Sequence, residues 1–125
     1  MTIHEVSEKY GISPDTLRYY EKVGMIPPVT RVRGIRNYTP EDIIWVQLAI
    51  CMRASGLSVD AMVQYVKLFR QGNKTIPERL SLMLEQKAEL MQKREKIDRA
   101  LAWLEIKIER YRGAEKTGVV QWDGK

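Results

Sequence analysis

The stretch of residues 13–24 reads SPDTLRYYEKVG, and it decides how the first part of the chain is expected to fold. A serine followed by a proline is typical of a helix N-cap and the first helical position, and a glycine commonly ends a helix. The preceding segment carries similar signals, with Thr2 and Glu5 as a capping box and Gly11 as the stop. Two short helices joined by a tight turn that contains glycine predict a helix-turn-helix.

The second of these helices carries adjacent tyrosines, which cannot both face a core. Leu17 must point inward, so Thr16, Arg18 and Tyr19 are expected to point largely outward. Tyr20 is expected to pack its ring and offer its hydroxyl to the backbone. Because the second helix of a helix-turn-helix enters the major groove, Arg18 is predicted to read guanine or hold phosphate, and Tyr19 to contact a base edge or phosphate. An ordinary amphipathic helix with a solvated arginine is the alternative.

Residues 25–38 are expected to form a two-stranded arm. Two consecutive prolines forbid a helix there, β-branched residues favour strands, and Gly34 favours a turn between them. The arm carries Arg31, Arg33 and Arg36. Their place next to the second helix suits contacts with DNA phosphates or with the minor groove.

The chain has 125 residues and a net charge of +5, and its positive charge is concentrated in one segment. Residues 1–60 hold seven Lys/Arg and seven Asp/Glu, whereas residues 17–36 hold five Lys/Arg and a single acid, Glu21. Such a local cluster favours an anionic partner. The single cysteine excludes an internal disulfide and a cysteine-rich metal site. No cofactor is indicated, and neither a membrane span nor a signal peptide is recognised, so a cytoplasmic location without a membrane partner is expected.

A third and a fourth helix are expected over residues 39–54 and 58–72, opened by Thr39 and Ser58. Acidic residues in the first turn of the third helix suit the helix dipole.

One long helix is expected from Thr75, with Glu78 as a capping box, to about Arg112. Its apolar residues recur at intervals of three, four and seven, which is the coiled-coil signature. The residues of this seam, which we expect to mediate dimerisation, are Leu80, Met83, Leu90, Ile97, Leu101, Leu104, Ile108 and Tyr111. Lys87 and Arg94 interrupt the seam and help to set its register. The alternative is a helix folded back on its own domain, although the fourth helix is too short to cover the seam.

Three segments and the long helix together resemble the mercury-resistance regulator (MerR) family. The segments are LRYYEKVGMIPP (residues 17–28), GIRNYTPEDI (residues 34–43) and RASGLS (residues 53–58). The resemblance implies a winged helix-turn-helix with the arm as the wing, and an antiparallel coiled-coil homodimer. It also implies binding to a pseudo-palindrome in an over-long promoter spacer of double-stranded DNA. Such regulators activate by bending and untwisting this DNA for RNA polymerase.

With this resemblance, a mainly α-helical protein in three parts is expected. Residues 1–73 would form the winged helix-turn-helix domain, residues 74–112 the dimerisation helix, and residues 113–125 a short tail with Trp122 as its only large anchor. Carried over by position, the recognition-helix contacts would be Thr16, Arg18, Tyr19 and Tyr20, the wing contacts Arg36 and Tyr38, and a second phosphate-binding patch Arg53 and Ser58. Ser58 is alternatively a plain N-cap, whose helix amides could serve a phosphate in either case.

The effector is suggested by what the chain lacks. Metal-sensing relatives carry cysteines around the coiled coil, and this chain has none there, with His4 as its only histidine. A tail of thirteen residues cannot build the ligand domain of multidrug sensors. The chain therefore resembles the small aldehyde- and nitrosative-stress-responsive (AdhR/NmlR-like) subgroup, which uses a cysteine in the third helix, and Cys51 lies there. Residue chemistry alone favours a small buried hydrophobe at Cys51, so a purely structural role is the alternative.

Other classes fit the sequence less well. An architectural DNA-binding accessory protein without effector sensing would share the winged domain but would not need a long dimer helix. A coiled-coil interaction protein would not need the arginine arm. An enzyme is not expected, because the sequence offers no Ser-His-Asp set, no nucleotide loop and no paired carboxylates in a cleft.

Overall fold

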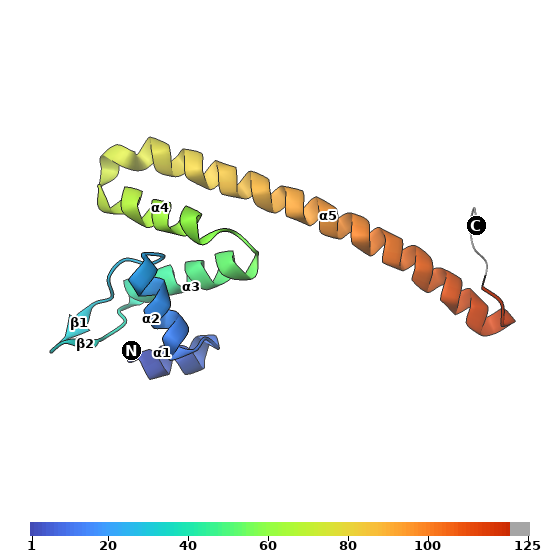
Figure 1. Cartoon of the computed structure of the whole chain (residues 1–125), viewed down its shortest axis with the longest axis horizontal. Helices are drawn as coiled ribbons and strands as arrows, with labels where there is room; N and C mark the ends of the chain where they lie inside the picture. Colours follow the sequence, from blue (N-terminus) through green and yellow to red (C-terminus); the bar gives the residue numbers. More distant parts are fainter. Residues whose placement is uncertain (121–125) are drawn as a thin grey trace. The chain divides into compact units, whose positions relative to one another are not determined.

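The computed structural model describes residues 1–120, which are mainly α-helical with a small two-stranded sheet (Figure 1). The helices are α1 (Ile3–Tyr10), α2 (Pro14–Val23), α3 (Pro40–Ala54), α4 (Val59–Arg70), the 3-10 turn η1 (Asn73–Thr75) and α5 (Ile76–Thr117). The strands are β1 (Arg31–Val32) and β2 (Ile35–Arg36). This order confirms the expected fold class. The chain divides into two compact units, Met1–Lys87 and the part that begins at Ala88.

Side-chain caps set the ends of the first two helices. Thr2 and Glu5 form the expected capping box, with the Thr2 amide donating to Glu5 Oε1 at 2.7 Å and the Glu5 amide to Thr2 Oγ1 at 3.1 Å. The Ser13 hydroxyl accepts a hydrogen bond from the Thr16 amide at 3.1 Å. Gly24 ends α2 with a φ of 85°, a left-handed conformation that glycine adopts without a Cβ clash. Local hydrogen bonds therefore determine where α2 begins and ends.

Four helices of the first unit pack around one apolar core. Its buried members are Val6, Leu17, Tyr20, Met25, Ile26, Val29, Tyr38, Trp45, Val46, Ala49, Met62 and Val66. The Trp45 ring meets the rings of Tyr65 and Phe69, with centroids 5.3 and 5.0 Å away. Full burial of Leu17 contributes about 1.5–3 kcal/mol and fixes which face of α2 points into the core. The opposite face of α2 is thereby turned outward.

The wing, residues 31–36, is a short antiparallel hairpin. Its paired residues are Arg31 with Arg36 and Val32 with Ile35. Arg33 and Gly34 form the turn with positive φ angles of 52° and 79°, as the two-residue type I′ hairpin turn requires. The regular strands are shorter than the arm expected over residues 25–38. Beyond the strands one further backbone bond joins the two arms, from the Asn37 amide to the Thr30 carbonyl oxygen at 2.7 Å, and Asp42 Oδ2 accepts from the Thr30 amide at 3.3 Å.

The junction between α4 and α5 differs from expectation. The predicted capping box of Thr75 and Glu78 is not formed, because Thr75 lies in η1 and its hydroxyl turns back toward α4. Thr75 Oγ1 lies 2.6 Å from the Leu68 carbonyl oxygen and accepts from Arg79 Nε at 3.1 Å. The Arg79 guanidinium lies 5.6 Å from the centre of the Phe69 ring. These contacts tie the first turns of α5 to α4.

Helix α5 has 42 residues and is about 63 Å long at 1.5 Å per residue. It continues through Gly113 to Thr117, five residues beyond the expected end at Arg112. In the single chain, six of the eight expected seam residues are exposed, namely Leu80, Ile97, Leu101, Leu104, Ile108 and Tyr111, while Met83 and Leu90 are half-buried. Trp122, the expected anchor of the tail, lies outside the described residues.

Candidate nucleic-acid interface

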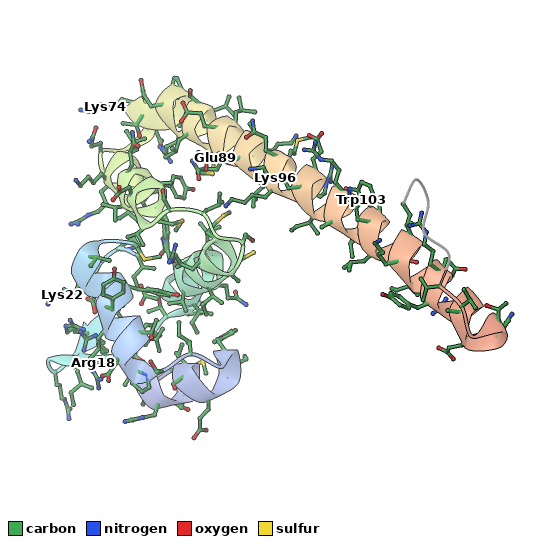
Figure 2. The ribbon with its side chains drawn as sticks, turned by 45° about the vertical axis from the view of Figure 1, so that its right-hand side comes forward. Arg18, Lys22, Lys74, Glu89, Lys96 and Trp103 are labelled. Carbon is green, nitrogen blue, oxygen red and sulfur yellow. The ribbon has the colours of Figure 1, made fainter. Side chains whose placement is uncertain are left out.

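Helix α2 presents a mixed cationic and aromatic face to the outside. Leu17 and Tyr20 are buried, whereas Arg18 and Tyr19 are exposed and Thr16 is half-buried. Arg18 Nη1 lies 2.9 Å from Asp15 Oδ1, an exposed pair one helical turn apart. Exposed ion pairs of this kind contribute little to stability. The Arg18 guanidinium can therefore leave Asp15 and bind another anion at little cost in free energy. Figure 2 shows Arg18 and Lys22 on the same outer side of α2.

The turn between α3 and α4 adds a second cationic position. Burial raises the pKa of the Tyr20 hydroxyl, and the positive charge of nearby Arg53 offsets part of this rise. Arg53, at the end of α3, is therefore close to α2. Its Nη1 donates to the Leu57 carbonyl oxygen at 2.7 Å. The Ser58 hydroxyl accepts from the Ala61 amide at 3.2 Å, so Ser58 is the N-cap of α4.

Glu21 connects α2 to the wing. Its two carboxylate oxygens pair with Arg36 Nε at 2.7 Å and Arg31 Nη2 at 3.2 Å. Burial alone would raise the pKa of Glu21, but hydrogen bonds from Arg36 and the Val29 amide, with the charges of both arginines, hold it below its usual value. Glu21 is therefore ionised at neutral pH. As the lone acid among five cations it stood out in the sequence, but its role in fixing the wing was not predicted.

Arg33 and Tyr38 have opposite surroundings. Arg33 is exposed at the wing tip, and among residues 1–120 its side chain has no hydrogen-bond or ion-pair partner. Tyr38 is 1 % exposed and packs in the core, so the expected contact of its side chain with the DNA backbone does not fit its position. The reason is that β2 ends at Arg36 and the chain then turns inward toward α3. Within residues 1–120 the buried Tyr38 hydroxyl has no partner.

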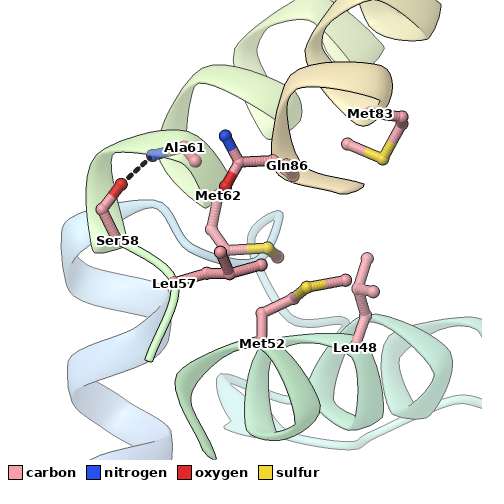
Figure 3. Close-up of a pocket in the computed structure, with 8 residues that line it drawn as sticks. All are labelled: Leu48, Met52, Leu57, Ser58, Ala61, Met62, Met83 and Gln86. Carbon is pink, nitrogen blue, oxygen red and sulfur yellow. Dashed lines mark hydrogen bonds between the residues drawn. The ribbon is translucent and has the colours of Figure 1, made fainter. Parts of the chain in front are cut away.

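Cys51 is exposed on α3 in the single chain. The alternative of a purely structural role assumed that Cys51 is buried, and this burial is not found. A small apolar cavity of about 20 Å³ lies between α3, α4 and the first turns of α5 (Figure 3). It is lined by Leu48, Met52, Leu57, Ser58, Ala61, Met62, Met83 and Gln86. This volume holds about one water molecule, so the cavity is too small for an organic effector.

Within residues 1–120, no group of three or more His, Cys, Asp or Glu side chains could hold a metal ion. None of the described helices is both long enough and apolar enough to cross a membrane.

Comparison with known proteins shows which family this chain resembles. Residues 1–68 match the family described as MerR HTH family regulatory protein. The transcriptional regulator AdhR of Bacillus subtilis is 42% identical over 93 residues, which are 74% of this chain and 66% of AdhR. The chain thus spans just under two thirds of the length of this relative.

Solved structures resemble the whole described fold. HiNmlR, a MerR family regulator lacking the sensor domain and crystallised with promoter DNA, superposes with a TM-score of 0.84 at 35% identity, covering 94% of each chain. A Listeria monocytogenes protein described as a MerR family transcriptional regulator superposes with a TM-score of 0.86 at 41% identity, covering 90% of this chain and 86% of its own. The relatives are transcription regulators rather than enzymes. The chain belongs to the MerR family and is a DNA-binding transcription regulator of the MerR type.

Proposed function

We propose that this protein acts as a homodimer that binds a pseudo-palindrome in an over-long promoter spacer and activates transcription by bending and untwisting the DNA. In this proposal residues 1–73 form the DNA-binding domain, residues 74–112 provide the dimerisation helix, and the tail from residue 113 has no assigned role. RNA polymerase takes part indirectly, through the remodelled promoter. The location that follows is the cytoplasm, where promoter DNA and polymerase are found.

The observation that carries the proposal is the group of cationic side chains on and around α2 in the first unit. Arg18 and Tyr19 face outward from α2, Arg31 and Arg36 of the wing are tied to the same helix through Glu21, and the charge of Arg53 acts on Tyr20. Arginine pairs with guanine edges and with phosphates, and tyrosine contacts either. The DNA contacts we propose are Thr16, Arg18, Tyr19, Tyr20, Arg31, Arg33, Arg36, Arg53 and Ser58.

The proposed dimer rests on the apolar seam of α5. Exposed side chains such as Ile97, Leu101 and Leu104 recur at coiled-coil spacing. A monomer would leave these side chains in water at a cost of about 25 cal/mol for each Å² of apolar surface. A second copy of the chain supplies the same seam. An antiparallel pairing of two such seams would give two recognition helices for the two halves of a pseudo-palindrome.

Binding is tested by fluorescence anisotropy with the duplex upstream of the gene and with a scrambled duplex, at several salt concentrations. We expect Arg18→Ala to weaken promoter binding by roughly 10- to 100-fold and to weaken binding to the scrambled duplex much less, by the loss of one positive charge. Lys74→Ala in η1 removes the same charge at an exposed position of the same unit and serves as the control. Equal promoter affinity of the Arg18 and Lys74 variants would contradict the proposed recognition surface.

For the effector, we propose that Cys51 responds to reactive aldehydes or other electrophiles. The exposure of Cys51 supports this, because a reactive cysteine needs access as well as some thiolate. With an aldehyde, the thiolate sulfur would bond to the carbonyl carbon, and the carbonyl oxygen would take up a proton to give a hemithioacetal. The resemblance to AdhR and HiNmlR adds support, and the cavity beneath α3 offers no room for a non-covalent organic effector.

The sensor is tested by in-vitro transcription from the gene's own promoter, with and without methylglyoxal. We expect methylglyoxal to activate the wild type and to leave Cys51→Ser unchanged, with both proteins binding the promoter equally. Equal activation of both proteins would assign Cys51 to packing alone. Activation of neither would remove aldehydes as the inducer.

A further inference from the structure

Glu21 holds the wing from a single position on the recognition helix. We propose that Glu21 is a positioning residue for DNA recognition. Its carboxylate holds the Arg31 and Arg36 guanidinium groups in a fixed relation to α2, so that their remaining N–H donors meet DNA phosphates while α2 reads the major groove. This inference rests on the proposed function.

Both oxygens of the Glu21 carboxylate are used. Oε1 accepts from Arg36 Nε at 2.7 Å, while Oε2 accepts from Arg31 Nη2 at 3.2 Å and from the Val29 amide at 2.9 Å. These groups come from β2, from β1 and from the segment that enters β1. One side chain of α2 thus fixes both strands of the wing and the backbone before them.

The exposures of the three side chains give the direction in which the arginines face. The side chain of Glu21 is only 10% exposed, whereas those of Arg36 and Arg31 are 28% and 40% exposed. The carboxylate therefore lies beneath the two guanidinium groups. A guanidinium has five N–H donors, and each arginine gives only one nitrogen to Glu21. The unused donors remain for an anion on the outer side.

Charge explains why an acid is needed at this position. Arg31 and Arg36 are directly opposite each other on β1 and β2, and like charges opposite each other destabilise a strand pair. The single negative charge of Glu21 offsets this repulsion and still leaves a net positive charge for DNA. If Glu21 instead masked the two arginines from DNA, its carboxylate would have to cover their outward-facing N–H donors. The burial of the Glu21 carboxylate disagrees with such a role.

The test compares Glu21→Gln with Glu8→Gln. Glu8 is an exposed acid on α1, so both variants raise the net charge by one. We expect both to bind a scrambled duplex more tightly than the wild type, because more positive charge favours any DNA. On the promoter duplex we expect Glu21→Gln to bind about tenfold more weakly than Glu8→Gln, since two arginine side chains must then be ordered on binding.

Equal promoter affinity of the two variants would overturn the inference. If Glu21→Gln instead binds the promoter more tightly than Glu8→Gln, Glu21 masks the arginines in the wild type, and the inference is also overturned. A double-mutant cycle separates positioning from packing. In an Arg31→Gln/Arg36→Gln background, Glu21→Gln should cause no further loss, and an unchanged tenfold loss there would show that Glu21 does not act through the arginines.

Folding is checked by circular dichroism, and Glu21→Asp provides a second variant. Aspartate keeps the charge but is one methylene shorter, so it cannot hold all three partners and should lose part of the promoter affinity. Wild-type promoter affinity of a folded Glu21→Asp would overturn the inference. The wild type is measured on both duplexes in the same experiment. If its affinity for the promoter equals its affinity for the scrambled duplex, the proposed function is refuted together with this inference.

Discussion

Replacing Arg33 by asparagine should stabilise the protein and weaken its binding to DNA. Arg33 has a φ of 52° at the wing tip, in the left-handed region that costs an L-residue roughly 1–2 kcal/mol. Asparagine tolerates this region much better and is preferred before glycine in type I′ turns. Since the Arg33 side chain has no partner among residues 1–120, its removal loses no intramolecular contact. We expect the free energy of unfolding to rise by about 0.5–1 kcal/mol.

The expected effect on DNA binding has the opposite sign. A strained residue is retained where it serves a function, and an unpaired arginine at the wing tip suits a phosphate or a minor-groove contact. Loss of one charged contact of about 1 kcal/mol would weaken promoter binding about fivefold. The slope of log affinity against log salt concentration should fall by about 0.9, because one phosphate contact is removed.

Arg33→Lys is the matched control, since it keeps both the charge and the backbone strain. Thermal unfolding by circular dichroism, at equal protomer concentrations, measures stability, and anisotropy across a salt series measures binding. Arg33→Lys should match the wild type in stability and in salt slope. If Arg33→Asn is no more stable than the wild type, the argument from backbone strain is refuted. If Arg33→Asn keeps the wild-type salt slope of DNA binding, the proposed DNA contact of Arg33 is refuted.

Three further predictions follow from the seam, the caps and Glu21. Leu101→Asp should weaken dimerisation by on the order of a hundredfold in analytical ultracentrifugation, because it places a charge in the apolar seam. The control Ala102→Asp, one residue along the helix, should leave the dimer unchanged. An intact Leu101→Asp dimer would contradict the proposed seam. Ser13→Ala should cost about 1 kcal/mol of stability in thermal unfolding, while Ser13→Asp keeps the cap, and equal stability of the two would argue against it. Because the folded-state pKa of Glu21 lies below its ordinary value of 4.5, its ionised form stabilises the fold above that pH. The stability difference between the wild type and Glu21→Gln should therefore shrink as pH falls below 4.5 through the folded-state pKa, and a difference that stays constant through the acid range would contradict it.

Much of the fold was predictable because its signals are local. The capping residues Thr2, Ser13 and Ser58 lie within three residues of the amides they bind, so their spacing along the chain contains the geometry. The recognition helix was predictable for the same reason, since the helical period alone separates buried Leu17 from exposed Arg18.

The errors and omissions concern contacts between segments. Thr75 was expected at a helix cap, yet its hydroxyl turns back toward α4, and the burial of Tyr38 in the core was not predicted. The exposure of Cys51 also depends on how α3 packs, which an apolar helix sequence does not reveal.

The sequence by itself determined the boundaries of α1, α2 and α3, the composition of the wing and the apolar spacing along α5, because each depends on residues within a few positions of one another. Only the tertiary structure decided the partners of Glu21, which lie 10 and 15 residues away in Arg31 and Arg36. An ion pair between distant residues forms where packing brings the two charges together. Its existence is therefore a property of the folded core, and the charge pattern alone indicates only that such a pair is possible.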